Sequence, residues 1–210
     1  MKTTLIFIFA LVATLSFGQD KFTTMMTKNI GSIYYAKTTD EYQQAINSFD
    51  RIASAEKTKW EPYYYSAFGN VMLANQEKEA TKKDAYLDLA LASVEKGKAI
   101  APGESELIAI EGFVHMIRVT VDPASRGQKY SGLAMNTFGK AVSLNPENPR
   151  ALTLMSQMQF GTAQFFGSPT TEACATIDKA LQKFTVFKTD NPLAPQWGKE
   201  MAEGVKLNCK

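Results

Sequence analysis

Apolar residues recur at helical spacing along most of the chain, and a short pattern of small and bulky residues repeats among them. Small Ala134, bulky Phe138 and small Ala141 are separated by steps of four and three, which place them on one helix face. Pro146 then ends the helix, because proline lacks an N–H and disfavours helix in the residue before it. The pattern predicts a helix whose small side chains let a neighbouring helix approach closely.

The same pattern occurs three more times, each time led by an alanine. Its members are Ala45, Phe49 and Ile52; Ala90, Val94, Gly97 and Pro102; and Ala173, Ile177 and Ala180. The four leading alanines follow one another at intervals of 45, 44 and 39 residues. Self-similarity at such a period is typical of stacked helix pairs.

The remaining apolar residues extend this helical prediction over the whole chain after the N-terminus. We expect helices at 21–36, 38–57, 61–74, 84–100, 104–119, 128–145, 149–166, 171–187 and 196–207, with polar, Pro- or Gly-containing connections between them. The segment 122–127 is the clearest predicted loop. The residues 185–187 have strand propensity but are too few to form a strand in a helical context.

The paired helices resemble tetratricopeptide repeats. The two central second helices carry the full small–bulky–small–Pro pattern, and the outer two carry a weaker form without the proline. The first helices keep a small residue near their middle, at Ala67, Gly112 and Ser156. The resemblance implies an all-α fold: a right-handed stack of antiparallel helix pairs (an α–α superhelix), about four pairs plus a C-terminal capping helix. The repeats are longer than the family's usual period of about 34 residues.

In such an array the first helices line a concave surface, and the family's groove-facing pattern selects an apolar, aromatic set of residues here. The candidate ligand- or peptide-binding residues are Tyr64, Phe68, Phe113, Met116, Gln157, Phe160 and Arg150. The family's clamps hold a peptide carboxylate with basic and amide side chains. Arg150 is the only plausible anchor of this kind here. The main interpretation is a protein- or peptide-binding adaptor. The alternative is a small-ligand or envelope-polymer binding module that uses the groove as a closed pocket.

A third possibility is that the aromatic residues of this groove have no ligand. They would then pack against an additional helix of the chain itself, either 21–36 or 196–207.

The N-terminus and the cysteines indicate export. Lys2 precedes an eleven-residue apolar run and small residues near Gly18, which predicts a signal peptide over 1–18 and a mature helical domain over 19–210. The run is shorter than the roughly 20 residues that span a bilayer. We therefore expect a periplasmic or secreted protein with no membrane span in its mature chain. Cys174 and Cys209 are an even pair, which favours a disulfide, with a free buried pair as the alternative.

Charge and chemistry exclude several classes of function. The chain carries 23 basic and 21 acidic residues, a near-neutral balance that argues against nucleic acid as a partner. The sequence contains no phosphate loop, nucleophile elbow or zinc motif, so we predict no enzyme, no metal site and no cofactor. His115 lies one turn after Glu111, but we expect it to be a hydrogen-bonded core histidine rather than a proton-transfer residue.

Overall fold

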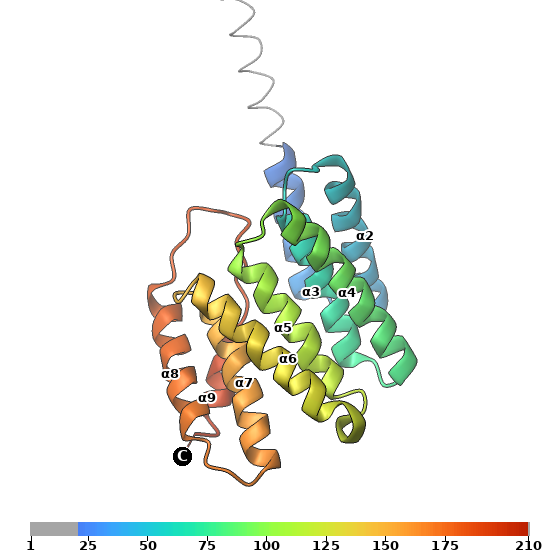
Figure 1. Cartoon of the computed structure of the whole chain (residues 1–210). Coiled ribbons are helices and arrows are strands. Elements are labelled where there is room, and N and C mark those ends of the chain that lie inside the picture. Colours follow the sequence, from blue (N-terminus) through green and yellow to red (C-terminus); the bar gives the residue numbers. More distant parts are fainter. Residues whose placement is uncertain (1–20, 210) are drawn as a thin grey trace, which may run out of the picture.

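The computed structural model describes residues 21–209 as a stack of helices (Figure 1). A helix over 21–35 is followed by α2 (Thr39–Ala55), α3 (Glu61–Gln76), α4 (Ala80–Ile100), α5 (Ser105–Val119), α6 (Pro123–Leu144), α7 (Pro149–Phe165), α8 (Thr171–Val186) and α9 (Lys199–Lys206). No strand occurs within 21–209, so the all-helical prediction is confirmed. The predicted signal peptide, residues 1–18, lies outside the described residues.

The helices from α2 onward form two layers. Each helix contacts the next one along the chain, and α3, α5 and α7 also contact one another in order. Among α2–α9, the even-numbered helices contact only odd-numbered ones. The odd-numbered helices α3, α5 and α7 therefore form a continuous inner layer, which the even-numbered helices cover on one side.

The repeated small–bulky pattern marks the buried stripes of the outer helices. In α6 only Ala134, Phe138 and Ala141 are buried, and in α8 only Ala173, Ile177 and Ala180. The α4 stripe is the predicted set Ala90, Val94 and Gly97, extended by Leu87. The predicted register is confirmed in all four helices that carry the pattern, since Ala45, Phe49 and Ile52 of α2 are also buried.

Three predicted helix starts are wrong, most clearly that of α6. The helix α4 begins at Ala80 rather than 84, α6 at Pro123 rather than 128, and α9 at Lys199 rather than 196. The segment 122–127, expected to be a loop, is the cap and first turn of α6. The Asp122 side chain accepts a hydrogen bond from the Ser125 N–H, and Pro123 occupies the first turn. Proline is tolerated there because that N–H has no helical partner, so Asp-Pro begins a helix here rather than a turn.

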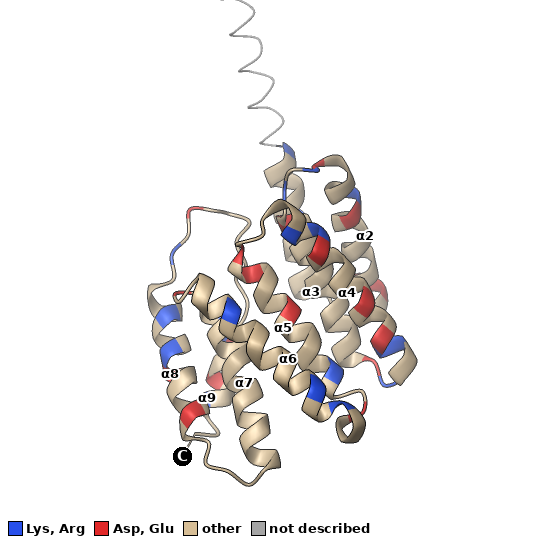
Figure 2. Cartoon of the chain, viewed as in Figure 1, with Lys and Arg blue, Asp and Glu red and all other residues tan. Residues whose placement is uncertain are grey.

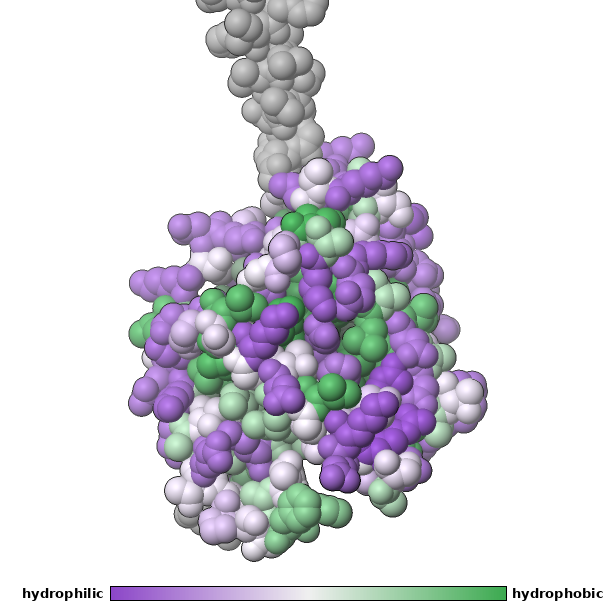
Figure 3. All heavy atoms as spheres, in the orientation of Figure 1, coloured by the Kyte–Doolittle hydropathy of each residue, from purple (hydrophilic) through white to green (hydrophobic). Residues whose placement is uncertain are grey.

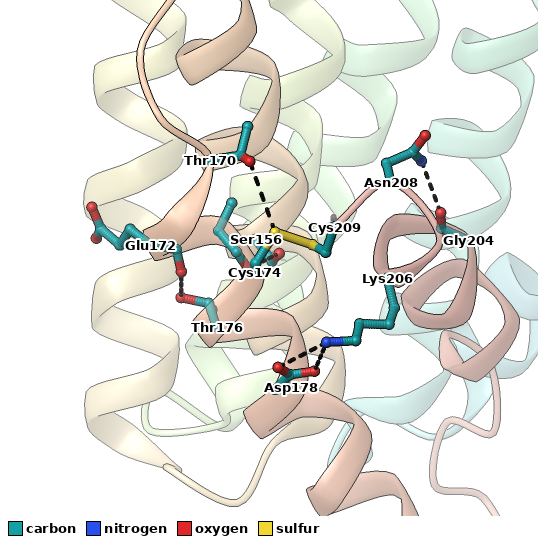
Figure 4. The surroundings of a disulfide bond; sticks show 11 residues. Ser156, Thr170, Glu172, Cys174, Thr176, Asp178, Gly204, Lys206, Asn208 and Cys209 are labelled. Carbon is teal, nitrogen blue, oxygen red and sulfur yellow. Dashed lines mark hydrogen bonds and ion pairs between the residues drawn. A yellow bond between two sulfur atoms is a disulfide. The ribbon is translucent and has the colours of Figure 1, made fainter.

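A disulfide fixes the C-terminus to the outer layer (Figure 4). Cys174 of α8 is bonded to Cys209, just after α9, which confirms the predicted pairing. Lys206 of α9 also forms an ion pair with Asp178 of α8, 2.6 Å between Nζ and Oδ1. The last helix is therefore tied to α8 by a covalent bond and a salt bridge.

The outer surface is mixed in charge and mostly hydrophilic. Figure 2 shows basic and acidic residues interspersed along the helices rather than gathered by sign. Figure 3 shows small apolar patches separated by hydrophilic residues on the same face. Over the residues that the structure describes, no helix has the length and apolar character needed to cross a membrane.

A substitution at Gly112 tests the close approach of α5 and α6. A Cβ at this position would lie 2.4 Å from Cε1 of the fully buried Phe138 ring. We expect Gly112→Ala to lower the free energy of unfolding by about 1–3 kcal/mol through overpacking. Gly139→Ala is the matched control, because a Cβ there meets no atom within 4 Å. Urea denaturation should show the control unchanged or stabilised by up to about 1 kcal/mol, and equal effects of the two changes would contradict the packing.

The disulfide gives a second test. The bonded residues are 35 apart, and closing such a loop restricts the unfolded chain. The double change Cys174→Ser and Cys209→Ser should cost about 3–4 kcal/mol of unfolding free energy in the chain-entropy description. Denaturation of the oxidised protein and the double variant measures the difference. A loss of unfolding free energy below about 1 kcal/mol would contradict the expected contribution of the disulfide to stability.

Candidate functional site

The C-terminal segment lies against the inner layer, where the sequence predicted a groove that is either open or covered by a terminal helix. After α8 the chain runs through an irregular stretch, 187–198, before α9 begins. The Trp197 ring packs between Phe68 of α3 and Phe113 of α5, with centroid distances of 5.2 and 6.2 Å. Its Nε1–H donates a 2.8 Å hydrogen bond to the Tyr64 hydroxyl. Trp197 therefore packs on the inner layer, over the face that the sequence predicted to be concave (called the concave face below), and joins two inner helices.

Two further tyrosines hold the same segment. The Tyr65 hydroxyl donates to the Leu193 carbonyl at 2.8 Å, and the Gln196 N–H donates to the Tyr34 hydroxyl at 3.1 Å. Burial raises the pKa of the Tyr34 and Tyr65 hydroxyls above the usual tyrosine value. These phenols therefore stay neutral and keep their donor and acceptor roles.

Arg150 is buried in an ion pair and does not face a groove, so its prediction as a ligand anchor is not supported by its position. Its Nε lies 3.0 Å from both Glu106 carboxylate oxygens, and Nη2 lies 2.6 Å from Oε1. The side chain is only 2% exposed, and the Phe187 ring lies 4.6 Å from its guanidinium carbon. Burial opposes the charged form, but the Glu106 carboxylate outweighs it and the pKa of Arg150 is raised.

Gly198 allows the segment to pass over this ion pair. It has a positive φ of 107°, and a Cβ there would lie 3.0 Å from Cγ of Arg150 and 3.1 Å from Cζ of Phe184. Glycine meets both the backbone and the space requirement. The position lets α9 begin immediately after Trp197.

Two hollows remain on the concave face beside the C-terminal segment. The tyrosine hollow, about 640 Å³, lies between the N-terminal helices, α3 and the start of α9. Its lining is Ile33, Tyr34, Tyr35, Tyr42, Phe68, Met72, Gln196, Trp197, Gly198, Lys199, Glu200 and Met201. The phenylalanine hollow, about 390 Å³, lies between the C-terminal ends of α3, α5 and α7 and the face of α9, and is lined by Asn75, Phe113, Met116, Ile117, Thr120, Gln157, Phe160, Gly161, Met201, Val205 and Asn208. Both volumes fall in the range of small-molecule sites.

The seven predicted site residues are distributed over three places. Four of them, from α5 and α7, line the phenylalanine hollow: Phe113, Met116, Gln157 and Phe160. Phe68 lines the tyrosine hollow, whereas Tyr64 and Arg150 are buried beneath the C-terminal segment. The structure therefore combines two of the expectations: part of the aromatic face is covered by the chain's own C-terminal segment, and part stays open.

Sequence reasoning missed the residues that the terminal segments contribute. Tyr34, Trp197 and Met201 line hollows from terminal segments outside the repeated pattern, and Tyr42 lies on α2 but outside its patterned positions. A tryptophan after the Pro-containing stretch 191–195 is an available signal, because so large an apolar side chain rarely stays in solvent.

His115 is not hydrogen-bonded to Glu111, one turn before it on α5. The Glu111 carboxylate accepts from Lys98 at 2.9 Å instead, and the His115 ring stacks on Tyr130 with a centroid distance of 6.2 Å. Its Nδ1 has no hydrogen-bond partner among residues 21–209, so the expectation of a hydrogen-bonded core histidine is not met at that atom. Burial lowers the pKa of His115. Over residues 21–209 no cluster of three or more His, Cys, Asp or Glu side chains could hold a metal ion.

The comparisons with known proteins find a similar fold among the solved structures. No family model matches the chain, so the tetratricopeptide resemblance remains a prediction, and no curated protein matches it either. Among solved structures, the chain is similar to the HusA haemophore from Porphyromonas gingivalis. The TM-score is 0.81 and the identity 24%, over 90% of this chain and 92% of that chain. The likeness shows that the two share an all-helical fold along nearly their whole length.

The buried Arg150–Glu106 pair gives a test of how the C-terminal segment is supported. Arg150→Met leaves a buried carboxylate without its partner and should cost about 3–5 kcal/mol of unfolding free energy. Adding Glu106→Gln should recover a large part of that loss, because the buried charge is then removed. The exposed pair of Lys183 and Glu147 is the control, and Lys183→Met should cost under about 1 kcal/mol. Chemical denaturation measures the free energy of unfolding of all three variants. An unchanged free energy of unfolding in Arg150→Met would contradict the burial of the pair.

Proposed function

We propose that this protein is an exported binding protein for a flat, largely apolar small molecule of the tetrapyrrole class, such as haem. The concave face carries two adjoining hollows walled by aromatic rings and thioethers. The similar solved structure is that of a haemophore. The predicted signal peptide and the disulfide support export. The single observation that carries the proposal is the pair of aromatic-lined hollows on the concave face of a fold shared with a haemophore.

The lining residues supply the interactions that such a ligand needs. Tyr35 is 83% exposed while lining the tyrosine hollow, so its ring is available to stack on a planar ligand. Lys199, on the same wall, offers a cation to a ligand carboxylate. For an iron centre the residues lining the hollows offer tyrosine hydroxyls and methionine sulfurs, both known haem ligands, whereas His115 lines neither hollow.

The adaptor interpretation keeps a specific observation in its favour. Phe165 and Phe166 end α7 with 79% and 71% of their surface exposed, and their rings lie edge to face. Exposed aromatic pairs are enriched where proteins meet other proteins. This pair suits a protein contact better than a small ligand, because it lines neither hollow.

A titration with hemin tests the proposal. Because the chain has two tryptophans, Trp60→Phe leaves Trp197 as the only tryptophan, whose fluorescence is excited selectively over that of tyrosine, and Trp197 lines the tyrosine hollow. We expect saturable quenching of its fluorescence and a shifted haem absorption band, with one hemin per chain and a Kd of about 1 µM or tighter. Metal-free protoporphyrin, titrated in parallel, separates recognition of the macrocycle from ligation of iron.

Two matched variants localise the binding. Phe160→Ala, in the phenylalanine hollow, should weaken hemin binding by about five-fold or more, since it removes an apolar wall. Phe165→Ala, five residues later but outside both hollows, should leave the Kd unchanged. No saturable change with either ligand would reject the proposal. Recovery of a protein partner that requires Phe165 and Phe166 would then favour the adaptor.

A further inference from the structure

A further hollow lies on a different face of α3 from the two on the concave face. The helices α2 and α4 both pack on α3 but do not contact each other, which leaves a groove between them (Figure 1). This outer hollow, about 370 Å³, shares no lining residue with the tyrosine and phenylalanine hollows. From α3 it takes Tyr63, Ser66 and Asn70, whereas Tyr64 and Phe68 contact Trp197. The outer hollow is therefore separate from the face proposed for haem.

Hydroxyl groups from the three helices of the outer hollow are bonded to one acidic residue or to each other. Ser66 Oγ donates to Oδ1 of Asp50 on α2 at 2.7 Å and lies 3.3 Å from Ser93 Oγ of α4. Because the single Ser66 hydroxyl proton goes to Asp50, Ser93 is the donor of the second bond. Ser54, which also lines the hollow, donates to the Asp50 carbonyl at 2.8 Å. These hydroxyl protons are all used within the protein, so the serines offer a ligand acceptor oxygens.

Asn70 adds a buried acceptor that has no partner. It is 3% exposed and lines the outer hollow. Its Nδ2 donates to the Ser66 carbonyl at 2.9 Å, one turn earlier on α3. Among residues 21–209 its Oδ1 accepts no hydrogen bond. A buried acceptor without a partner is unfavourable, so a group that donates to it from the hollow is stabilised there.

The two charged side chains that line the outer hollow also have no ionic partner. Within residues 21–209, neither Asp50 nor Lys96 of α4 forms an ion pair. By contrast, Glu111 of the next inner helix is paired with Lys98 of α4 at 2.9 Å. Asp50 and Lys96 are both exposed, so a ligand that carries an opposite charge for each can reach them from solvent.

We propose that the outer hollow binds a small zwitterion with an apolar side chain, either an apolar amino acid or the N-terminal end of a short peptide. The ammonium group of the ligand pairs with Asp50 and donates to Oδ1 of Asn70, because a carboxylate and unpaired acceptors favour a charged donor. The ligand carboxylate pairs with Lys96. Ile46 and Leu89 line the same hollow and contact the apolar side chain, and Leu89 is 54% exposed without it. The volume suits a small molecule.

Calorimetric titrations with leucine and its analogues test the inference. Leucine should bind saturably, one molecule per chain, with a Kd of about 1 mM or tighter. N-Acetylleucine keeps the side chain and the carboxylate but has no ammonium group, so it should bind about ten-fold more weakly or worse. Leucyl-leucine separates the two sources of ligand. Tighter binding than leucine identifies a peptide N-terminus, and weaker binding identifies a free amino acid.

Two substitutions assign the two charges. Asp50→Asn keeps an oxygen acceptor for Ser66 and should weaken leucine binding by about ten-fold or more. Lys96→Met should weaken leucine binding by about three-fold or more. It should leave the affinity for 3-methylbutylamine unchanged, because this amine has the leucine side chain but no carboxylate. Asp40→Asn on α2 and Lys140→Met on α6 are exposed controls outside the hollow, and neither should change the Kd.

The outcomes are distinct from those of the hemin titration, because the outer hollow shares no lining residue with the other two. Thermal unfolding first establishes that each variant is folded, and Lys96→Met carries the test if Asp50→Asn is not. No saturable binding of leucine or leucyl-leucine, equal affinity for N-acetylleucine, or wild-type affinity in Asp50→Asn would overturn the inference and leave the haem proposal as it stands.

Discussion

The close approach of neighbouring helices at small side chains is the constraint on which this fold depends. Gly112 faces the Phe138 ring, and Gly97 faces Leu107 at a distance that would place a Cβ 2.7 Å from Cδ2. At Ser156 the side chain is small enough to approach α8 and donate to the Ala173 carbonyl at 2.7 Å. Each contact joins a helix of the inner layer to a helix of the outer layer. Together these contacts hold α3, α5 and α7 side by side as one surface.

That surface is too apolar to remain uncovered, which explains the role of the C-terminal segment. The inner helices are apolar on several sides, and a helix of this kind must be buried on more than one face. Trp197 covers the centre, while α9 covers part of α7 and α8. The segment itself has little helical structure between 187 and 198, so it depends on fixed partners. The Tyr64, Tyr65 and Tyr34 hydroxyls and the disulfide provide them.

The sequence predicted the repeated elements well because their signal is local and periodic. The stripe Ala134, Phe138 and Ala141 follows from helical spacing alone, and so do nearly all helix positions. The start of α6 did not follow, because Asp-Pro is compatible with both a turn and a helix cap, and only the Ser125 contact decides. The site was predicted in part: Phe113 and Phe160 are repeat positions. Met201 and Tyr34 lie outside the repeat and reach the concave face through long-range packing that no local pattern encodes.

The partial cover of the concave face is what makes this face suited to a small molecule under the proposed function. An uncovered inner layer would offer a long groove, which suits an extended peptide or a partner helix. Trp197 and α9 instead leave two hollows of about 640 and 390 Å³, a size that suits compact ligands rather than chains. Their walls are rich in aromatic and thioether groups, with few charges to fix a polar partner. Binding of a planar apolar molecule between such walls is favourable, because it removes from water both the apolar surface of the molecule and that of the walls.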